Sequence, residues 1–141
     1  MRRLVTGIRD GKSCVVQEDA LSPQGAELVH DRFYTVGVDP APMRPAGRGA
    51  FLDIQVPAGS LAFATVYFPP DSGWPQMHKT DSIDLHTIVS GSVELILDDG
   101  AHTLSAGDCA VVAGVDHAWR TGAEGCTTSI VIVGTPPRAK A

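Results

Sequence analysis

The sequence predicts an all-β fold, a sandwich or closed barrel with few or no helices. Fifteen glycines and ten prolines are spread along the 141 residues, and almost no stretch carries apolar residues at helical spacing for three turns. Short apolar and alternating runs recur between turn signals at regular intervals, as in β-sandwiches and barrels. The length suits one hydrophobic core, so we expect a single domain over residues 1–141 with less than about a quarter of its residues in helix.

The candidate strands follow one another between these turns. The first two, residues 2–8 and 13–18, flank the turn "RDGK". The others are residues 32–38, 51–56, 61–68, 83–91, 92–98, 101–106, 109–114 and 127–134. Residues 38–50 are rich in proline and glycine without periodicity, which predicts a long surface loop inside the domain. Residues 134–141 are expected to form a frayed tail.

The composition favours a small-molecule ligand or substrate. The formal net charge is −5 and the pI is about 5.4, so no basic stripe is available for a nucleic acid or an anionic membrane. The N-terminal residues contain no apolar run long enough for a signal peptide or a membrane helix, which predicts a cytoplasmic protein. The three cysteines, Cys14, Cys109 and Cys126, have no close-pair spacing, and this argues against both a disulfide framework and a thiolate zinc site.

The stretch "HKTDSIDLHTIVSG", from His78 to Gly91, is the candidate for chemistry. A continuous strand would hold His78 and Asp84 roughly 20 Å apart, too far to share an ion. The side chains of "KTDS", residues 79–82, favour a chain reversal between them. After that turn, Asp84, His86 and Ile88 fall on one strand face, where a carboxylate and an imidazole can share a metal. His117, in "GVDHAW", is a further ligand candidate from a second turn.

These segments resemble the cupin superfamily, in particular small single-domain cupins with an RmlC-like jelly roll. The resemblance rests on "MHKTDSID", "VSGSVELILDDG", "LSAGDCAVV" and "DHAW", in that order and spacing, and on the opening "RRLVTGIRDGKSCVV". It covers residues 61–133 as the barrel core, with residues 1–60 supplying N-terminal strands and the loop. It implies a double-stranded β-helix that binds one divalent transition metal per chain.

The resemblance also implies a ligand set, with departures from the usual pattern. His78 takes the place of the first cupin histidine and His117 that of the last. Thr80 stands at the usual second-histidine position, and Asp84 replaces the glutamate. His86 shares a face with Asp84 and is a candidate either for a fourth ligand or for a catalytic acid or base. These ligand types suit zinc, iron, manganese or nickel and do not choose among them.

Each candidate has a structural alternative. His78 and His117 agree with two separate motifs, which favours ligation over a polar barrel rim. Asp84 would be costly to bury unpaired, whereas His86 is equally well explained as a hydrogen-bonded lining residue. Surface positions are the better interpretation of His30 and His102. The candidate substrate-pocket residues are Trp74, Met77, Thr80 and Trp119, of which the aromatic residues and Met77 are core residues in many β-proteins.

Three functions follow from this site. The first is a metal-dependent lyase or cyclase that decarboxylates, dehydrates or cyclises a small carbonyl-containing substrate, of the polyketide or aromatic kind that such cupins act on. In this hypothesis Asp84 and His86 are the catalytic residues. The second is a binding module without catalysis, and the third is an iron-dependent dioxygenase. We also expect a homodimer that pairs through the N-terminal strands, because an exposed sheet edge is normally covered or paired.

Overall fold

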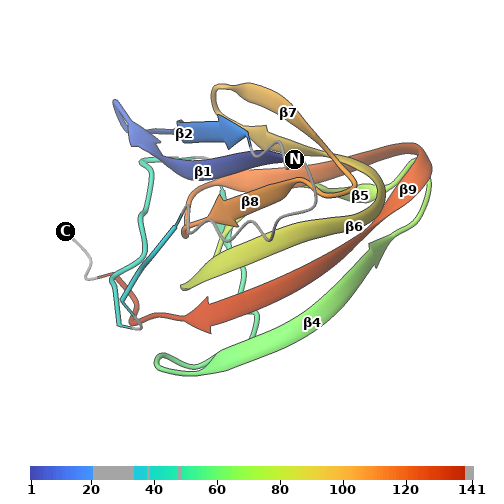
Figure 1. Cartoon of the computed structure of the whole chain (residues 1–141). Coiled ribbons are helices and arrows are strands. Elements are labelled where there is room, and N and C mark those ends of the chain that lie inside the picture. The colour runs from blue at the N-terminus through green and yellow to red at the C-terminus, as the bar shows by residue number, and fades with distance from the viewer. Residues whose placement is uncertain (21–33, 38, 48, 139–141) are drawn as a thin grey trace.

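The computed structural model describes residues 1–20, 34–37, 39–47 and 49–138, and within these ranges it contains strands and no helix (Figure 1). The all-β prediction is therefore confirmed. The strands are β1 (Arg2–Arg9), β2 (Lys12–Ala20), β3 (Ala50–Phe51), β4 (Leu61–Phe68), β5 (Gly73–Lys79), β6 (Ser82–Leu97), β7 (Gly100–Ser105), β8 (Cys109–Val112) and β9 (His117–Gly134).

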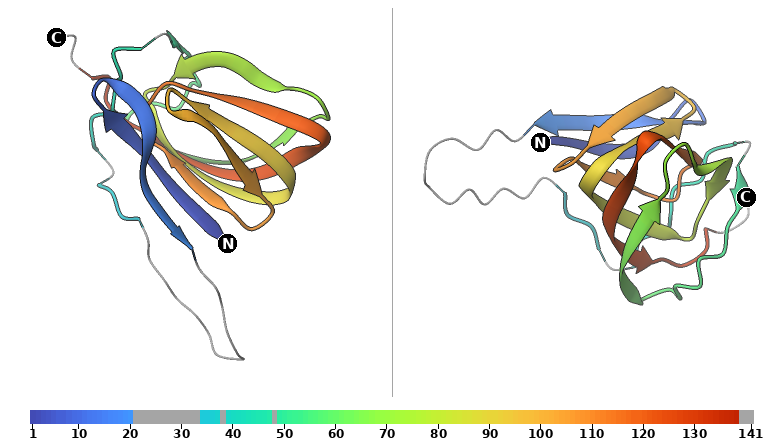
Figure 2. Two further views of the ribbon diagram at one scale, coloured as in Figure 1. Left: turned by 90° about the horizontal axis from the view of Figure 1, so that it is seen from above. Right: turned by 90° about the vertical axis from the view of Figure 1, so that its right-hand side faces the viewer.

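The strands form one curled sheet that wraps into a jelly-roll half-barrel (Figure 2). Its strand order is β2-β1-β8-β6-β9-β5-β3, with β4 paired to β9 and β7 paired to β6. Most pairs are antiparallel, but β1 pairs with β8 in parallel. The N-terminal strands therefore belong to the same sheet as the barrel core and extend it beyond β8.

Two long bent strands, β6 and β9, are neighbours in the middle of the sheet. They pair with each other over most of their lengths, with irregular register after Ile88 and Gly91. Gly91 has a φ of 71°, and a Cβ there would lie 2.1 Å from the carbonyl oxygen of Gly125. Only glycine adopts this positive φ readily and also leaves room for the neighbouring carbonyl. Residues 83–91 and 92–98, expected as two strands, are thus one strand that bends at this glycine.

The hydrophobic core fills the inside of the curl. Leu4, Leu95, Leu104 and Trp119 belong to its main cluster. A smaller cluster around Ile83 and Val111 lies on the other side of the sheet, where Tyr34 and Val36 pack against it. The alternation in β6 places Asp84, His86 and Ile88 on the buried face, with Leu85, Thr87 and Val89 on the more exposed one. This is the two-residue period expected from the sequence.

Besides the merged strand β6, the structure differs from the expected strands in four places. The strand β9 begins at His117, although the sequence predicted a strand only over residues 127–134. Residues 73–79 form β5, which the sequence did not suggest because Gly73 and Pro75 interrupt its pattern. Residues 52–56 are irregular and only Ala50–Phe51 pairs. Tyr34–Gly37 form no strand, and the rest of the expected strand 32–38 lies outside the described residues.

The described part of the long loop, residues 39–47 and 49, is irregular as expected, although it is not wholly at the surface. Pro42 and Pro45 are buried, and the Met43 amide donates to the Ala113 carbonyl at 3.2 Å. Arg44 forms an ion pair with Asp81 in the turn between β5 and β6. The loop therefore packs against the end of the barrel that holds the candidate site. None of the described segments is a helix that could cross a membrane.

Candidate functional site

Two of the predicted ligands meet across neighbouring strands. His78 in β5 and His117 in β9 are direct register partners, and their ring centroids lie 4.2 Å apart. The chain reversal that the sequence required does occur, because β5 ends at Lys79 and β6 begins at Ser82. A register irregularity between Trp74 and His78 accompanies this pairing, as bulges often do where a strand directs a side chain into a site.

Both imidazoles form the same kind of hydrogen bond through Nδ1. The Nδ1 of His78 lies 3.0 Å from the Gln76 carbonyl, and the Nδ1 of His117 lies 2.9 Å from the Val115 carbonyl. A carbonyl only accepts, so each Nδ1 carries the proton and each Nε2 keeps its lone pair. Metal-binding histidines are commonly oriented by such a bond from the opposite ring nitrogen.

His86 shows a similar arrangement from β6. Its Nδ1 lies 3.4 Å from the Thr128 hydroxyl, which can donate its own proton to the Thr87 carbonyl at 3.1 Å. The Thr128 oxygen is then free to accept the Nδ1 proton of His86. The His86 Nε2 is buried and has no hydrogen-bond partner among the described residues, and in the tautomer with the proton on Nδ1 it carries a bare lone pair.

Burial keeps these imidazoles neutral. It lowers the pKa of His117 to about 3, with smaller contributions from the neighbouring imidazoles of His78 and His86. It lowers the pKa of His86 to about 4, and it also lowers the pKa of His78. A histidine must be neutral to bind a metal through its lone pair. We call His78, His86 and His117 the imidazole cluster.

The predicted carboxylate lies in a separate group of polar side chains. Ser82 donates to the Asp84 carboxylate at 2.6 Å, and the Ser82 and Thr80 hydroxyls are 2.8 Å apart. Within the described chain, Asp84 has no hydrogen bond or ion pair with the imidazole cluster. Burial raises the pKa of Asp84 to about 6, against the opposing effect of the Ser82 hydrogen bond. We call Thr80, Ser82 and Asp84 the carboxylate group.

Asp116 is a further buried carboxylate beside the site, and it orders the long loop. It accepts a hydrogen bond from the Gly49 amide at 3.1 Å and lies 3.9 Å from the Lys79 ammonium. A Cβ at Gly47 or Gly49 would collide with its carboxylate. These glycines therefore let the loop backbone close over the acid, which in turn holds the loop against β5 and His78.

A row of aromatic rings leads from the surface to the imidazole cluster. Trp74 is 46% exposed and its ring centroid lies 5.5 Å from that of His78. Trp119 is buried between the cluster members, 4.8 Å from His86 and 6.0 Å from His117 by ring centroids. Met77 is half-buried. Of the predicted pocket residues, Trp74 is thus an exposed ring beside His78 and Trp119 a buried ring beside His86 and His117, while Thr80 belongs to the carboxylate group.

The residues present fit a divalent transition metal in their donor chemistry. His78 and His117 offer two adjacent neutral nitrogens, and His86 offers a third buried nitrogen without a partner. In the described ranges, no three or more His, Cys, Asp or Glu side chains are close enough together to make a complete metal site. The structure therefore supplies an adjacent histidine pair, and within the described ranges neither His86 nor the predicted Asp84 completes a three-ligand set with His78 and His117.

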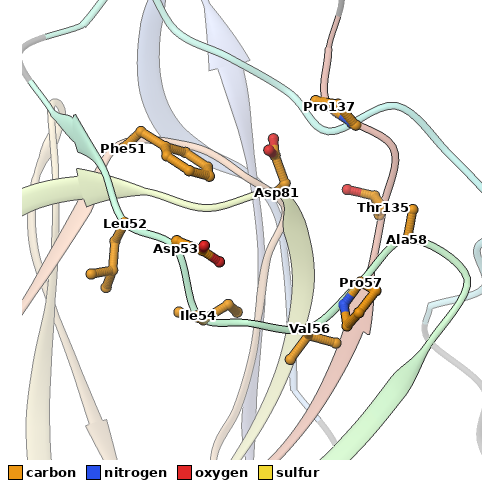
Figure 3. Close-up of a pocket in the computed structure, with 10 residues that line it drawn as sticks. All are labelled: Phe51, Leu52, Asp53, Ile54, Val56, Pro57, Ala58, Asp81, Thr135 and Pro137. Carbon is orange, nitrogen blue, oxygen red and sulfur yellow. The ribbon is translucent and has the colours of Figure 1, made fainter.

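A surface cavity of about 230 Å³ lies next to the turn between β5 and β6 (Figure 3). The irregular segment 51–58 curves around it, with Asp81, Thr135 and Pro137 on the other side. It contains none of the predicted pocket residues. Of the other histidines, His102 makes a surface contact with Asp99 at 2.7 Å, as expected, and His30 lies outside the described residues.

The sequence did not reveal Ser82, Asp116 or Thr128 as parts of the site. Ser82 looked like a turn residue, although it lies two positions before Asp84 and so shares its face. Thr128 could be placed inside by the same two-residue period in β9, but its partner His86 is 42 residues away. Only the register between β6 and β9 brings those two residues together.

The topology brings a histidine of each expected motif together, because β5 and β9 pair at His78 and His117. The first runs from His78 in β5 through β6 to the turn glycine Gly91, and the second runs from Gly107 through β8 to His117 at the start of β9. The chain has a cupin fold. Among solved structures, an RmlC-like cupin from Shewanella frigidimarina is similar, with a TM-score of 0.46, 20% identity, and coverage of 51% of this chain and 64% of that one.

Curated relatives match part of this cupin-fold chain. The phomopsin biosynthesis cluster protein C' of Diaporthe leptostromiformis is 38% identical over 68 residues, which are 48% of this chain and 35% of the relative. The oryzines biosynthesis cluster protein J of Aspergillus oryzae is 30% identical over 96 residues, covering 62% of this chain and 52% of the relative. The chain thus spans about a third to a half of the length of these relatives. No protein-family model matches it.

Proposed function

We propose that the protein is a metal-dependent lyase or cyclase of secondary metabolism, acting on a small carbonyl-containing substrate. The observation that carries this proposal is the imidazole cluster, in which His78 and His117 bond to backbone carbonyls through Nδ1 and the buried Nε2 of His86 has no hydrogen-bond partner among the described residues. Structural histidines in a core normally satisfy both ring nitrogens. Partial similarity to proteins named for the phomopsin and oryzine biosynthesis clusters supports the secondary-metabolism part.

His78 and His117 would hold the ion, and His86 is the proposed third ligand. The bare Nε2 of His86 suits ligation better than proton transfer, because an imidazole with a pKa near 4 is a weak base. A divalent ion at this position supplies Lewis-acid polarisation of a substrate carbonyl or carboxylate oxygen. Trp74 and Trp119 would enclose the apolar part of the substrate.

Asp84 is the proposed proton carrier. Its carboxyl is buried and hydrogen-bonded to Ser82, which in turn contacts Thr80. The Ser82 hydroxyl would stabilise the deprotonated carboxylate by donating to it, and no hydrogen bond or ion pair within the described residues ties Asp84 to the imidazole cluster. Proton removal next to a carbonyl and proton return after bond cleavage are the steps that a lyase or cyclase needs.

Removal and return of the metal tests this function. The protein is purified without chelator and its metal content is measured. It is then stripped and assayed with small β-keto acids and linear polyketone acids after addition of zinc, manganese, iron or nickel. We expect turnover that is lost on stripping and restored by at least one metal. Ligand binding without turnover would indicate a binding module, and oxygen uptake with stoichiometric iron would indicate a dioxygenase. Either result would reject the lyase or cyclase proposal.

A further inference from the structure

The cavity of about 230 Å³ beside the turn between β5 and β6 has walls fixed by backbone hydrogen bonds (Figure 3). At one end of the segment 51–58, the Leu52 amide donates to the Lys79 carbonyl at 2.8 Å. Just past the other end of that segment, the Gly59 amide donates to the Gly134 carbonyl at 3.0 Å. The cavity therefore belongs to the folded barrel and is not a gap beneath an unattached loop.

A buried hydroxyl without a partner faces this cavity. Thr135 lines the cavity and is only 2% exposed, and its Oγ1 has no hydrogen-bond partner among the described residues. Figure 3 shows this oxygen directed into the space that the lining residues surround. The Thr135 amide is already used, because it donates to the Asp81 carbonyl at 3.0 Å. Buried polar groups are nearly always hydrogen-bonded in native proteins, so the free hydroxyl indicates a partner that binds from the cavity.

Hydrogen-bond acceptors dominate the polar part of the lining. The described lining residues with polar side chains are Asp53, Asp81 and Thr135. Ionised carboxylates only accept, and the Thr135 hydroxyl can accept as well as donate. The amides of Leu52 and Thr135 are already bonded, and the lining prolines have no N–H. A ligand of this cavity must therefore bring most of the hydrogen-bond donors itself.

The two carboxylates differ in what neutralises them. Arg44 forms an ion pair with Asp81, and its guanidinium carbon lies 5.2 Å from the centroid of the Phe51 ring. Asp53 has no ion pair within the described chain, and one of its oxygens is held by the Gln55 amide at 2.8 Å. Figure 3 shows the Asp53 carboxylate turned toward the centre of the cavity. This oriented and uncompensated carboxylate favours a cation over an anion.

The rest of the lining is apolar and indicates the kind of cation. It consists of Phe51, Leu52, Ile54, Val56, Pro57, Ala58 and Pro137. A bare metal ion such as calcium prefers a shell made wholly of oxygen atoms, whereas hydrocarbon walls suit the apolar body of an organic cation. The volume lies below the roughly 300–1,000 Å³ of common ligand pockets, so the ligand is a small molecule.

We propose that this cavity binds a small organic ammonium compound with an apolar body. The ammonium group would donate to the Asp53 carboxylate and, directly or through a water molecule, to the Thr135 hydroxyl. The hydrocarbon part would pack against Ile54 and Val56. The cavity contains no residue of the imidazole cluster, so its ligand is distinct from a substrate held there and the proposal does not rest on the proposed metal chemistry.

A titration followed by NMR tests the site with probes of one shape and different charge. Cyclohexylammonium, cyclohexanol and cyclohexanecarboxylate are added separately to labelled protein at equal ionic strength. Cyclohexylammonium should shift the amide signals of Ile54, Val56 and Thr135 saturably, with a dissociation constant in the millimolar range or below. Cyclohexanol should bind about 10-fold more weakly, because it cannot form a charged hydrogen bond with a carboxylate. Cyclohexanecarboxylate should leave these signals unchanged.

Two variants test the polar contacts. Asp53→Asn and Thr135→Val should each weaken cyclohexylammonium binding by about 10-fold. Asp71→Asn is the matched control, because it removes the same charge at an exposed turn before the other end of β5, and it should bind like the wild type. Circular dichroism checks that each variant keeps the β-fold. Unchanged affinity in both Asp53→Asn and Thr135→Val would overturn the proposal.

The probes can also reject the site outright. Absence of saturable shifts at the lining signals would do so, and so would equally tight binding of cyclohexanecarboxylate. Calcium chloride is titrated as well, and displacement of cyclohexylammonium by micromolar calcium would identify a metal site instead. All titrations use metal-free protein, so their failure is separate from failure of the proposed function, which the metal-dependent turnover assay decides.

Discussion

The imidazole cluster and the carboxylate group differ in what burial does to them. Burial favours the neutral form in both. For His86 and His117 the neutral form is the one that binds metal, so burial prepares them for ligation. For Asp84 the neutral form carries a proton, and its pKa of about 6 lets it hold or release that proton near neutral pH. One barrel interior thus prepares two neighbouring groups for different tasks.

The largest effect is expected at the histidine pair. His78→Ala or His117→Ala should abolish both metal binding and turnover, because the remaining cluster members cannot replace a missing nitrogen of the pair. The β-fold should remain, since the main core cluster contains neither histidine. Metal analysis and activity assays measure the outcome, with His102→Ala at the surface as the control. Full metal content in both variants would show that the pair is only a polar barrel rim.

The next prediction distinguishes a role of the carboxylate group in turnover from a role in metal binding. Asp84→Asn should lower turnover by about 100- to 10,000-fold, the usual contribution of a positioned acid or base. The asparagine still accepts from Ser82 but cannot carry the proton. Single-turnover assays of metal-loaded protein measure the change. Ser82→Ala should give a smaller loss, because it removes the hydrogen bond and leaves the carboxyl in place. Unchanged turnover in Asp84→Asn would remove Asp84 from the reaction.

The Asp84→Asn variant, which is expected to lose turnover, should gain folding stability at neutral pH. The folded-state pKa of Asp84 is raised from 3.8 to about 6, so the wild type loses stability as the pH rises through this interval. Asp84→Asn should avoid that loss and be more stable by roughly 1 to 3 kcal/mol at pH 7, with little difference at pH 4. Urea unfolding of metal-free protein at both pH values measures this. An equal difference at the two pH values would contradict a raised pKa.

The histidines should give the reverse pH dependence. Their folded-state pKa values lie below the ordinary value of 6.5, so their neutral burial favours folding above pH 6.5 and this contribution is lost as the pH falls toward 4. His86→Gln should flatten the loss of unfolding free energy over this interval by about 1 kcal/mol or more. Urea unfolding of metal-free protein tests it, and an unaltered slope would contradict the depressed pKa of His86.

The smallest effect concerns Thr128, which orients His86. Thr128→Val removes the hydroxyl at nearly constant volume, and Thr128→Ser keeps it. We expect the valine variant to lose about 10-fold in metal affinity, as for other residues that orient ligands, and the serine variant to stay near the wild type. Nitrogen NMR of labelled histidine should show the Nδ1 proton of His86 lost or mixed only in the valine variant. An unchanged tautomer there would contradict the orientation by Thr128.

The sequence predicted the fold well because its signals are local. Turn residues and the two-residue period identified β1, β2, β4, β7 and β8 nearly at their observed bounds, and the order of the motifs indicated the jelly roll. It failed at β5 because Gly73 and Pro75 are poor strand residues, and the pairing with β9 at the two ends of β5 outweighs that local preference. The sequence indicated a turn at Gly91 because glycine is also a poor strand residue, whereas the structure has a bend within β6 there.

The site was only partly predictable. The motifs identified His78 and His117, whose strands pair directly. They also grouped Asp84 with those histidines, and within the described residues no three such side chains form a complete metal site, so the role of Asp84 stays a prediction. Ring orientation, the hydroxyl chain through Ser82, and the Thr128 contact depend on strand register and on side-chain rotamers. Those properties arise from contacts between residues far apart in the chain, which a single sequence does not display.

Metal titration of the wild type and of Asp84→Asn, side by side, tests the central claim most directly. If the imidazole cluster holds the ion and Asp84 moves the proton, both proteins should bind the same number of metal ions per chain, because Asp84 would then lie outside the ligand set. The affinity of Asp84→Asn should be much closer to that of the wild type than to that of His117→Ala. Calorimetry with the metal that restores turnover gives both quantities. A loss of metal in Asp84→Asn comparable to that in His117→Ala would contradict the account and make Asp84 a ligand.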